Sequence, residues 1–323
     1  MSQQVLFELN NVCKYFPASK KRVVKAVDDI SLKIYKGETL SLVGESGCGK
    51  TTLGRTVLGI YPKTSGEIRY KDQSTDHMTS AQKKSFQKEN QMIFQDPYSC
   101  LDPRMSIGSI IEEGMKVHFQ MSAQQRQQEV VRLLERVGLP KEMLSRFPHE
   151  LSGGQRQRIG IARALATKPE FIVCDEPIAA LDSSIQAQVI NLMMDLQQEL
   201  GLTYLFISHD LSMVRHISDR ICIMYLGAVA ELGEADEIDK SPIHPYTQAL
   251  FSAVPQIDDQ NWSSKRIKLE GEIPNPINAP KGCRFCTRCP LAKDICKETP
   301  PKLEEARPGH YVACHCWNQT GRK

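Results

Sequence analysis

The chain has 323 residues, of which 41% are hydrophobic and 24% are charged. This length exceeds that of one small domain and predicts a main domain of ordinary size with an appendage. The composition is typical of a globular protein and excludes the collagen, coiled-coil and disordered classes. Because 41 basic residues stand against 38 acidic ones, the formal net charge is only +3, which gives no indication of a nucleic-acid partner.

The sequence also lacks the marks of a membrane or secreted protein. No stretch approaches the roughly 18 to 20 uninterrupted apolar residues that a membrane helix needs. The first residues, MSQQVLFELN, contain neither the basic nor the apolar segment of a signal peptide. We therefore expect the chain to stay in the cytosol.

The first part of the chain predicts strands that lead into a glycine-rich turn. Short apolar or alternating stretches occur at residues 5–12 and within residues 28–44, and the second stretch ends at the turn. Helical spacing follows over residues 51–60. The order strand, glycine-rich loop, helix is that of a nucleotide-binding α/β protein.

The middle of the chain predicts a helical insert at about residues 96–160. Within it, an amphipathic helix is expected over residues 122–138, because four apolar residues recur on one face. They are Val130, Leu133, Leu134 and Val137. Strands return at residues 170–177 and 202–210, each followed by helix-like sequence, so the core is predicted to be a parallel sheet with crossover helices.

The composition shifts near residue 241, where proline becomes frequent and a cysteine cluster follows. We therefore expect two parts. The main domain covers residues 1–240, and a C-terminal extension covers residues 241–323.

A phosphate-binding loop is predicted from Gly44 to Thr51, which fit the pattern G-x-x-x-x-G-K-[ST] between a strand and a helix. Glycines let backbone N–H groups converge on phosphate oxygens, and the following helix points its positive end at them. Lys50 is expected to reach the β and γ phosphates, and the Thr51 hydroxyl to bind Mg²⁺. The predicted nucleotide contacts of this loop are Gly44, Glu45, Ser46, Gly47, Cys48, Gly49, Lys50, Thr51 and Thr52.

Two carboxylates end the buried-type strand FIVCDE, as in a Walker B segment. Asp175 is expected to hold Mg²⁺ through water. Glu176 is on the opposite face of the strand, where it is placed to orient or deprotonate the attacking water. The pair therefore predicts hydrolysis of the bound nucleotide.

The segment LSGGQ at residues 151–155, followed by RQRIGIARAL, resembles the signature motif of the ABC ATPases. The resemblance implies an α/β fold, a P-loop NTPase ABC ATPase domain with a RecA-like core, an antiparallel β subdomain and a helical subdomain. It also implies that the bound nucleotide is ATP. The residues of the motif expected to contact nucleotide are Ser152, Gly153, Gly154 and Gln155.

Further motifs of that family follow in its usual order. Gln95 in QMIFQDP resembles the Q-loop glutamine, Asp182 the D-loop aspartate, and His209 in FISHD the switch histidine. The resemblance implies that Gln95 and His209 act in catalysis, and that Gln95 also contacts Mg²⁺. Phe16 matches the aromatic residue that stacks on adenine, with Tyr15 as its rival.

The resemblance implies that two such domains pair head to tail. Ser152 and Gly154 of one domain then face the γ-phosphate that Lys50 of the other domain holds. A helix N-terminus after Ser152 would supply positive potential to this phosphate. Hydrolysis removes these contacts and biases the pair toward opening.

A narrower resemblance rests on HELSGGQRQRIGIARAL and on HPYTQALFSAVP before a cysteine-bearing tail. Together they are similar to the ATP-binding subunits of oligopeptide and dipeptide permeases, and most to the F-type subunit. This implies a related second ATP-binding subunit, two transmembrane permease subunits, an extracellular or periplasmic peptide-binding protein, and a place at the cytoplasmic face of the membrane. The alternatives are a nickel or metal-chelate importer and a soluble ABC ATPase without a transport role.

Six of the eleven cysteines crowd between Cys283 and Cys316, which in a reducing cytosol indicates metal ligation before disulfides. The spacing C-x-x-C-x-x-C-P is typical of bacterial iron–sulfur ligands. Zinc in a four-cysteine site is the alternative. The permease family's pattern implies that a [4Fe-4S] cluster is held by Cys283, Cys289, Cys296 and Cys314. Cys286 and Cys316 remain alternative ligands.

Overall fold

The structure is a computed structural model that describes all residues except 1–3, 20–21, 97, 255–265, 273 and 321–323. Its contacts divide the chain into two compact units. The first unit comprises Met1–Gln4, Tyr35–Glu38 and Ser74–Ile207, and the second comprises Val5–Ile34, Thr39–Gln73 and Ser208–Lys323.

A parallel three-stranded layer forms the centre of the first unit. Strand β6 (Asn90–Ile93) pairs with β7 (Phe171–Asp175), and β7 pairs with β8 (Thr203–Ser208). All five residues of β7 are buried, as expected for a central strand of a parallel sheet. The parallel sheet predicted from residues 170–177 and 202–210 is confirmed here, whereas β6 is an additional strand.

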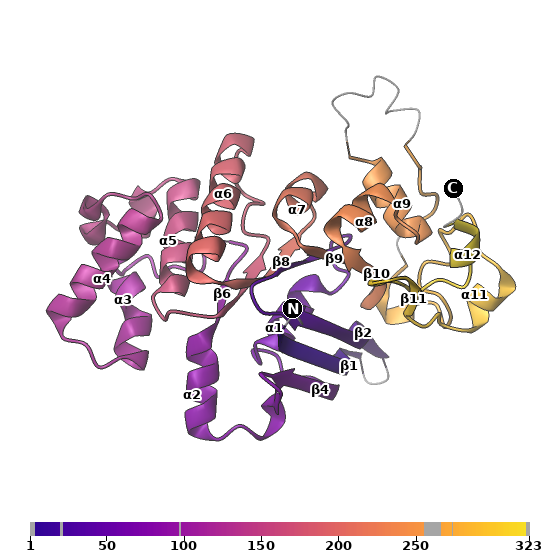
Figure 1. Cartoon of the computed structure of the whole chain (residues 1–323), viewed down its shortest axis with the longest axis horizontal. Helices are drawn as coiled ribbons and strands as arrows, with labels where there is room; N and C mark the ends of the chain where they lie inside the picture. Colours follow the sequence, from indigo (N-terminus) through magenta and orange to yellow (C-terminus); the bar gives the residue numbers. More distant parts are fainter. Residues whose placement is uncertain (1–3, 20–21, 97, 255–265, 273, 321–323) are drawn as a thin grey trace. The chain divides into compact units, whose positions relative to one another are not determined.

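Helices make up the rest of the first unit (Figure 1). They are α2 (Ser80–Glu89), α3 (Ile107–His118), α4 (Ala123–Arg136), α5 (Gly153–Leu165) and α6 (Ser183–Leu200), with short 3-10 turns at Thr75–His77, Lys141–Ser145 and Pro148–Glu150. The amphipathic helix predicted over residues 122–138 is confirmed as α4. Ser122 caps its first turn in a capping box with Gln125, and the four predicted apolar residues are buried.

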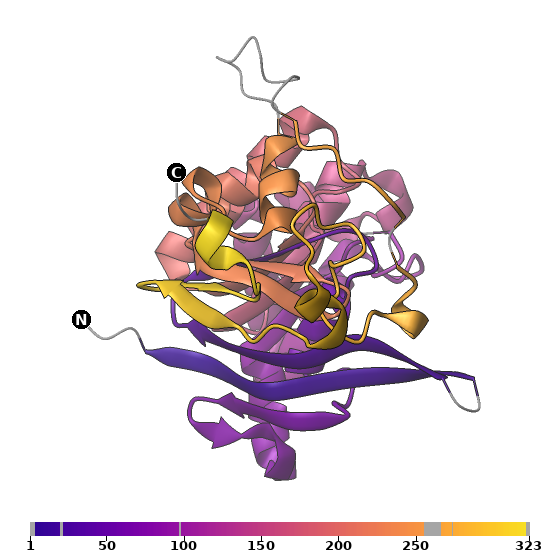
Figure 2. The same cartoon turned by 90° about the vertical axis from the view of Figure 1, so that its right-hand side faces the viewer.

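The second unit contains an antiparallel sheet of long strands. Its order is β2 (Arg22–Tyr35), β1 (Val5–Ser19), β4 (Ser65–Tyr70) and β5 (Gln73–Ser74). Strands β1 and β4 pair in antiparallel register. Figure 2 shows the long strands of this sheet side by side. This is the antiparallel subdomain that the family resemblance implied.

A second group of strands in the same unit mixes both directions. Strand β3 (Thr39–Val43) runs parallel to β9 (Arg220–Tyr225), and β9 pairs antiparallel with β10 (Ala228–Glu234). The apolar run of β3 is fully buried. Helix α1 (Lys50–Val57) follows β3, and α7 (Leu211–Ile217) precedes β9.

The C-terminal part of the second unit continues this strand group. Strand β12 (His310–Val312) pairs with β10, and β11 (Glu304–Arg307) pairs with β12. The helices of this part are α8 (Ala235–Lys240), α9 (Pro245–Ser252), α11 (Asp294–Glu298) and α12 (Trp317–Thr320), with a 3-10 turn at Pro276–Asn278. In Figures 1 and 2 the yellow C-terminal segment lies beside the orange strands β9 and β10. The division at residues 240 and 241 stays a prediction, and part of the predicted extension, residues 255–265 and 273, lies outside the described residues.

A buried carboxylate ties this C-terminal part to β10. Glu231 is 0% exposed, and its two oxygens accept hydrogen bonds from the backbone N–H groups of Ile243 at 2.7 Å and His244 at 2.8 Å. One of them also lies 2.6 Å from Nε2 of His310. Burial lowers the pKa of His244 to about 4, so this histidine is neutral at physiological pH. No helix among the described residues is both long and apolar enough to cross a membrane.

Candidate functional site

The predicted phosphate loop lies between β3 and α1, so the expected order of strand, loop and helix is confirmed. Gly49 caps α1 with a φ of 110°, a left-handed conformation that favours glycine. A Cβ atom at this position would lie 2.0 Å from the carbonyl oxygen of Ala26. The loop therefore needs glycine here both for its backbone angle and for its close approach to the neighbouring strand.

The side chain of Lys50 is buried within this loop. Its side chain is 5% exposed, and its Nζ donates to the carbonyl oxygens of Gly44 at 2.7 Å and Glu45 at 3.1 Å. Thr51 and Thr52 occupy the first turn of α1 and are half-buried. A cation and a helix N-terminus at one loop fit the phosphates of a nucleotide.

Residues from the C-terminal part also contact this loop. The N–H of Glu45 donates to the hydroxyl of Tyr246 at 3.0 Å, and Nη1 of Arg288 lies 3.0 Å and 2.9 Å from the two carboxylate oxygens of Glu45. Neither Tyr246 nor Arg288 was expected from the sequence to lie at the loop. The only sequence signal near Tyr246 is HPYTQAL, which indicated a family and not a contact.

In the first unit, the structure brings Glu176 and Gln95 together. Asp175 ends β7 and is fully buried, and Glu176 follows it with a φ of 45°. Such a left-handed conformation is uncommon for residues other than glycine, and strained residues of this kind cluster at functional sites. The N–H of Glu176 donates to the carbonyl oxygen of Ile207 at 2.9 Å, and its Oε2 accepts from Nε2 of Gln95 at 3.0 Å.

The signature segment begins helix α5. Ser152 is the N-cap, its Oγ accepts from the N–H of Gln155 at 3.3 Å, and Oε1 of Gln155 accepts from the N–H of Ser152 at 3.0 Å. This capping box provides partners for N–H groups at the N-terminal end of α5. A Cβ atom at Gly154 would lie 2.7 Å from Cγ2 of Ile185, so glycine lets α5 approach α6 closely. Asp182 is the exposed N-cap residue of α6.

The candidate adenine and switch residues lie in the second unit. The Tyr15 hydroxyl is bonded to the carboxylate of Asp28, whereas the half-buried Phe16 ring packs edge-on against Tyr61 at 5.5 Å. His209 is exposed at the start of α7. The predicted ATP site draws on both units, and the meeting of its parts stays a prediction, as do the roles given to its residues.

The six tail cysteines lie within 34 positions of one another in the sequence, and several lie near enough to affect one another's pKa. Burial raises the pKa of Cys283 to about 12, and the nearby Cys296, Cys314 and Cys286 add to the shift. Burial also raises the pKa of Cys314 to about 11. At neutral pH these two side chains are therefore thiols, and metal binding would have to release their protons.

The predicted metal ligands do not converge. Among the described residues, no three His, Cys, Asp or Glu side chains are placed to hold a metal ion. Two thiols are engaged elsewhere, because Sγ of Cys314 accepts from the N–H of Cys316 at 3.3 Å and Sγ of Cys316 donates to the carbonyl of Leu291 at 3.5 Å. The quartet expected from the sequence is thus not assembled, whether it is drawn from Cys283, Cys289, Cys296 and Cys314 or includes Cys286 and Cys316.

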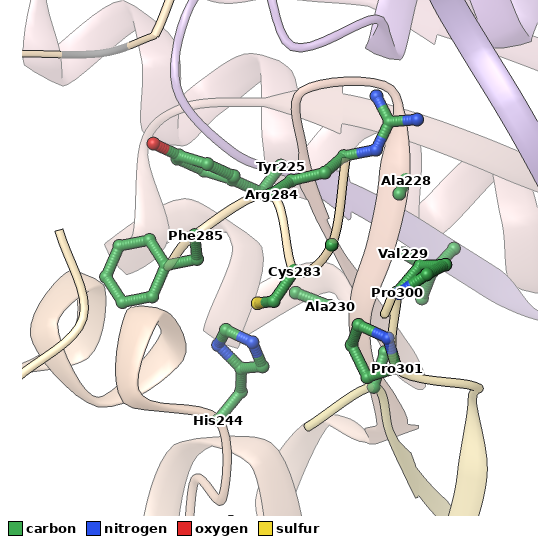
Figure 3. Close-up of a pocket in the computed structure, with 12 residues that line it drawn as sticks. Tyr225, Ala228, Val229, Ala230, His244, Cys283, Arg284, Phe285, Pro300 and Pro301 are labelled. Atoms are coloured by element: carbon green, nitrogen blue, oxygen red, sulfur yellow. The ribbon is translucent and has the colours of Figure 1, made fainter. Parts of the chain in front are cut away.

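A small cavity of about 70 Å³ lies beside Cys283 (Figure 3). His244, Phe285 and Pro301 are among its lining residues. Nδ1 of His244 accepts from the N–H of Tyr246 at 3.1 Å, so this nitrogen is already engaged. The cavity has room for a few waters and none for a peptide.

Comparison with protein-family models finds two matches. Residues 27–179 match the model described as "ABC transporter". Residues 230–296 match the model described as "Oligopeptide/dipeptide transporter, C-terminal region". The first match contains the phosphate loop and Glu176, and the second contains Arg288 and four of the six tail cysteines, up to Cys296.

Curated relatives extend the likeness over the whole chain. The oligopeptide transport ATP-binding protein AppF of Bacillus subtilis is 53% identical over 326 residues, covering 98% of this chain and 99% of the relative. The dipeptide transport ATP-binding protein DppF of Haemophilus influenzae is 49% identical over 93% of both chains. Among solved structures, the ATP-binding cassette MJ0796 in a dimeric post-hydrolysis state with ADP and Pi has a TM-score of 0.66 at 27% identity, covering 71% of this chain and 99% of that one.

Proposed function

We propose how this chain, which belongs to the ABC transporter family and is an ATP-binding and ATP-hydrolysing subunit of a peptide importer, performs its reaction. As such a subunit it works with permease partners that form the path through the membrane, and it lies peripherally at that membrane. The observation that carries the mechanism is the hydrogen bond between Gln95 and Glu176 at the end of β7.

Binding begins at the phosphate loop. Lys50 is held inside the loop by two carbonyl oxygens, and with ATP bound its ammonium turns to the β and γ phosphates. A bound Mg²⁺ would offset the negative charge of the phosphates. The residues proposed to hold it are Thr51, Asp175 and Gln95. Phe16 is proposed to stack on the adenine, because the Tyr15 hydroxyl is already bonded to Asp28.

Glu176 is proposed as the general base. A base must lie within hydrogen-bond reach of the proton that it takes, and its orientation must be fixed. The amide of Gln95 fixes one carboxylate oxygen at 3.0 Å. The left-handed backbone of Glu176 departs from the extended conformation of β7 directly after Asp175. The carboxylate held in this way is proposed to take a proton from the attacking water. His209 is proposed to contact the γ-phosphate from the start of α7.

The site is proposed to be composite. Ser152, Gly153, Gly154 and Gln155 stand at the N-terminal end of α5, where backbone N–H groups favour an anion. These residues complete the nucleotide site of a partner domain, and the partner's signature completes this chain's site. Asp182 lies at the junction of the two domains. ATP then joins the pair, and hydrolysis releases it.

The partner is proposed to be a second, related ATP-binding subunit, with two transmembrane permease subunits and a peptide-binding protein outside the membrane. The chain works at the cytoplasmic face, where ATP is available. The match of residues 230–296 to an oligopeptide and dipeptide transporter region favours peptides over nickel chelates, and over a role without transport.

A [4Fe-4S] cluster in the tail is also proposed. Six cysteines within a short span support it. Holding such a cluster requires four thiols to lose protons and to turn toward one another, because the described side chains do not converge. Zinc is the competing occupant. Metal and sulfide analysis of protein prepared without oxygen separates the two.

Transport assays in proteoliposomes test the function. The chain is reconstituted with its permease subunits, the partner ATPase and the binding protein, with ATP enclosed on the side of the ATPases. Uptake of a labelled peptide should require ATP and should stop when Glu176→Gln replaces the wild-type chain. Uptake of a nickel chelate without uptake of any peptide would overturn the proposed cargo, and no ATP-dependent uptake of either would overturn the transport role.

A further inference from the structure

An arginine from the cysteine-bearing tail reaches the phosphate loop. Arg288 lies between Cys286 and Cys289, and its Nη1 is 3.0 Å and 2.9 Å from the two carboxylate oxygens of Glu45. The Arg288 side chain is 8% exposed and that of Glu45 is 23% exposed. Such a largely buried ion pair is screened less by water and salt than a surface pair.

Glu45 is held from two further sides. Its N–H donates to the hydroxyl of Tyr246, which is itself 0% exposed, and its carbonyl oxygen accepts from Nζ of Lys50 at 3.1 Å. Arg288 in turn donates to the hydroxyl of Tyr225 at 3.3 Å. The loop residue next to Gly44 is therefore fixed between the phosphate-binding lysine and the tail.

A second arginine, four positions before Arg288, fixes the same tail segment. Arg284 donates to the carbonyl oxygen of Leu226 and to the carboxylate of Asp28. The neighbouring Gly227 donates its N–H to the carbonyl oxygen of Cys48 at 2.8 Å, and accepts from the N–H of Asp28 at 2.8 Å. Arg288 thus contacts the phosphate loop itself. Arg284 contacts Leu226, which precedes Gly227, and Asp28, which is bonded to Gly227.

The charges of Arg288 and Glu45 make their contact important for nucleotide binding. The Glu45 carboxylate stands in a loop that must accept the negative phosphates of a nucleotide, and like charges repel more strongly where water is partly excluded. Arg288 offsets that carboxylate and fixes its direction. Without the guanidinium, Glu45 is an uncompensated anion beside the phosphates, and its side chain loses the contact that fixes its direction.

We propose that Arg288 is a positioning residue of the nucleotide site, which the tail supplies and which acts through Glu45 to hold the phosphate loop ready for ATP. This inference deepens the proposed function and rests on it, because it takes the loop to be the place where ATP binds. A tail that folds correctly is then a condition for tight nucleotide binding by this chain.

A double-mutant cycle tests the proposal on the full-length chain, with a fluorescent ATP analogue, Mg²⁺ and no partner subunit. Arg288→Ala should weaken binding of the analogue about five- to tenfold, between the effects of exposed and buried charge pairs. In a Glu45→Gln background the same Arg288→Ala change should cost less than about twofold, because the carboxylate through which it acts is gone. The separate effect of Glu45→Gln is subtracted by the cycle.

Two further variants complete the experiment. Arg288→Lys keeps the charge and should recover at least half of the lost affinity, whereas Lys302→Ala, an exposed cation of the same tail, should match the wild type. Equal losses from Arg288→Ala with and without Glu45 would overturn the proposal, as would an unchanged affinity in a variant that keeps its unfolding temperature. If the wild-type chain itself fails to bind the analogue, the proposed function fails instead. If the wild type binds and Lys50→Ala does not, the proposed function stands and the cycle alone decides the role of Arg288.

Discussion

The phosphate loop, residues 44–52, and the cysteine-bearing tail, residues 283–316, are both turn-rich segments with few apolar residues, yet different contacts hold them. The loop is closed by local bonds, such as the N–H of Cys48 to the carbonyl of Glu45 at 3.2 Å and that of Leu53 to Gly49 at 2.9 Å. The tail is fixed by residues far away in the chain. Arg288 and Glu45 are 243 positions apart, and His310 and Glu231 are 79 apart.

A sequence motif can therefore specify the phosphate loop, whereas only the complete fold can specify the tail. The bonds between near neighbours let the loop's own pattern of glycines specify most of its geometry, and Tyr246 and Arg288 add contacts at Glu45. A tail held by long-range bonds takes its shape from the partners that it meets. The loop therefore supplies the chemistry, while the tail is expected to adjust how well the loop performs it.

The largest effect is expected from Glu176→Gln, which tests the locally encoded chemistry. The amide keeps the shape of the side chain but cannot accept a proton, so hydrolysis in the assembled transporter should fall about 100- to 10,000-fold. Binding of ATP should persist and the pair should trap it. The rate is measured after the partner's own site has been silenced.

The matched control for that measurement is Glu142→Gln, an exposed glutamate in the 3-10 turn Lys141–Ser145. It should hydrolyse ATP at the wild-type rate. Turnover of Glu176→Gln near that rate would remove Glu176 from its role as base.

Lys50→Ala should come next in size and should act on binding itself. It removes a cation that is 5% exposed and bonded within the loop, so ATP affinity should fall about 30- to 1,000-fold. Direct titration with a fluorescent nucleotide measures the loss, and the exposed Lys141→Ala serves as its control. An unchanged affinity would show that the loop does not hold the phosphates through this residue.

Cysteine variants test which residues of the tail hold a metal. If the family pattern selects the ligands, Cys283, Cys289, Cys296 and Cys314 replaced one at a time by Ser should each lose iron and sulfide, while Cys286→Ser and Cys316→Ser should keep them. A severe loss in Cys316→Ser would mean that this chain has exchanged a ligand. Zinc without iron or sulfide in the wild-type protein would contradict the cluster.

The smallest effect is expected from Tyr246→Phe, which removes the hydroxyl that accepts from the N–H of Glu45. One hydrogen bond contributes about 0.5–1.5 kcal/mol, so nucleotide affinity should fall about threefold. Tyr311→Phe, on the tail strand β12, should leave the affinity unchanged. Equal effects of the two substitutions would indicate general loosening of the tail and no specific hold on the loop.

Much of the chain could be predicted wherever the signal was local. The glycine pattern placed the phosphate loop, the apolar period placed α4, and the runs FIVCDE and LTYLFIS placed β7 and β8. The strands β11 and β12 escaped prediction because they have four and three residues, too few to establish an alternating pattern. The contact of Arg288 with Glu45 could not be predicted, because nothing in the sequence around this arginine indicates a partner 243 positions earlier.

A composite nucleotide site can be tested by measuring ATP hydrolysis by one preparation of this chain in two states. The rate per chain is measured first on a verified monomer and then after assembly with the permease subunits and the partner ATPase. The monomer should hydrolyse ATP slowly, and the rate should rise at least about tenfold on assembly, since an opposing signature must complete the site. A verified monomer that hydrolyses ATP as fast as the assembled transporter would contradict the composite site.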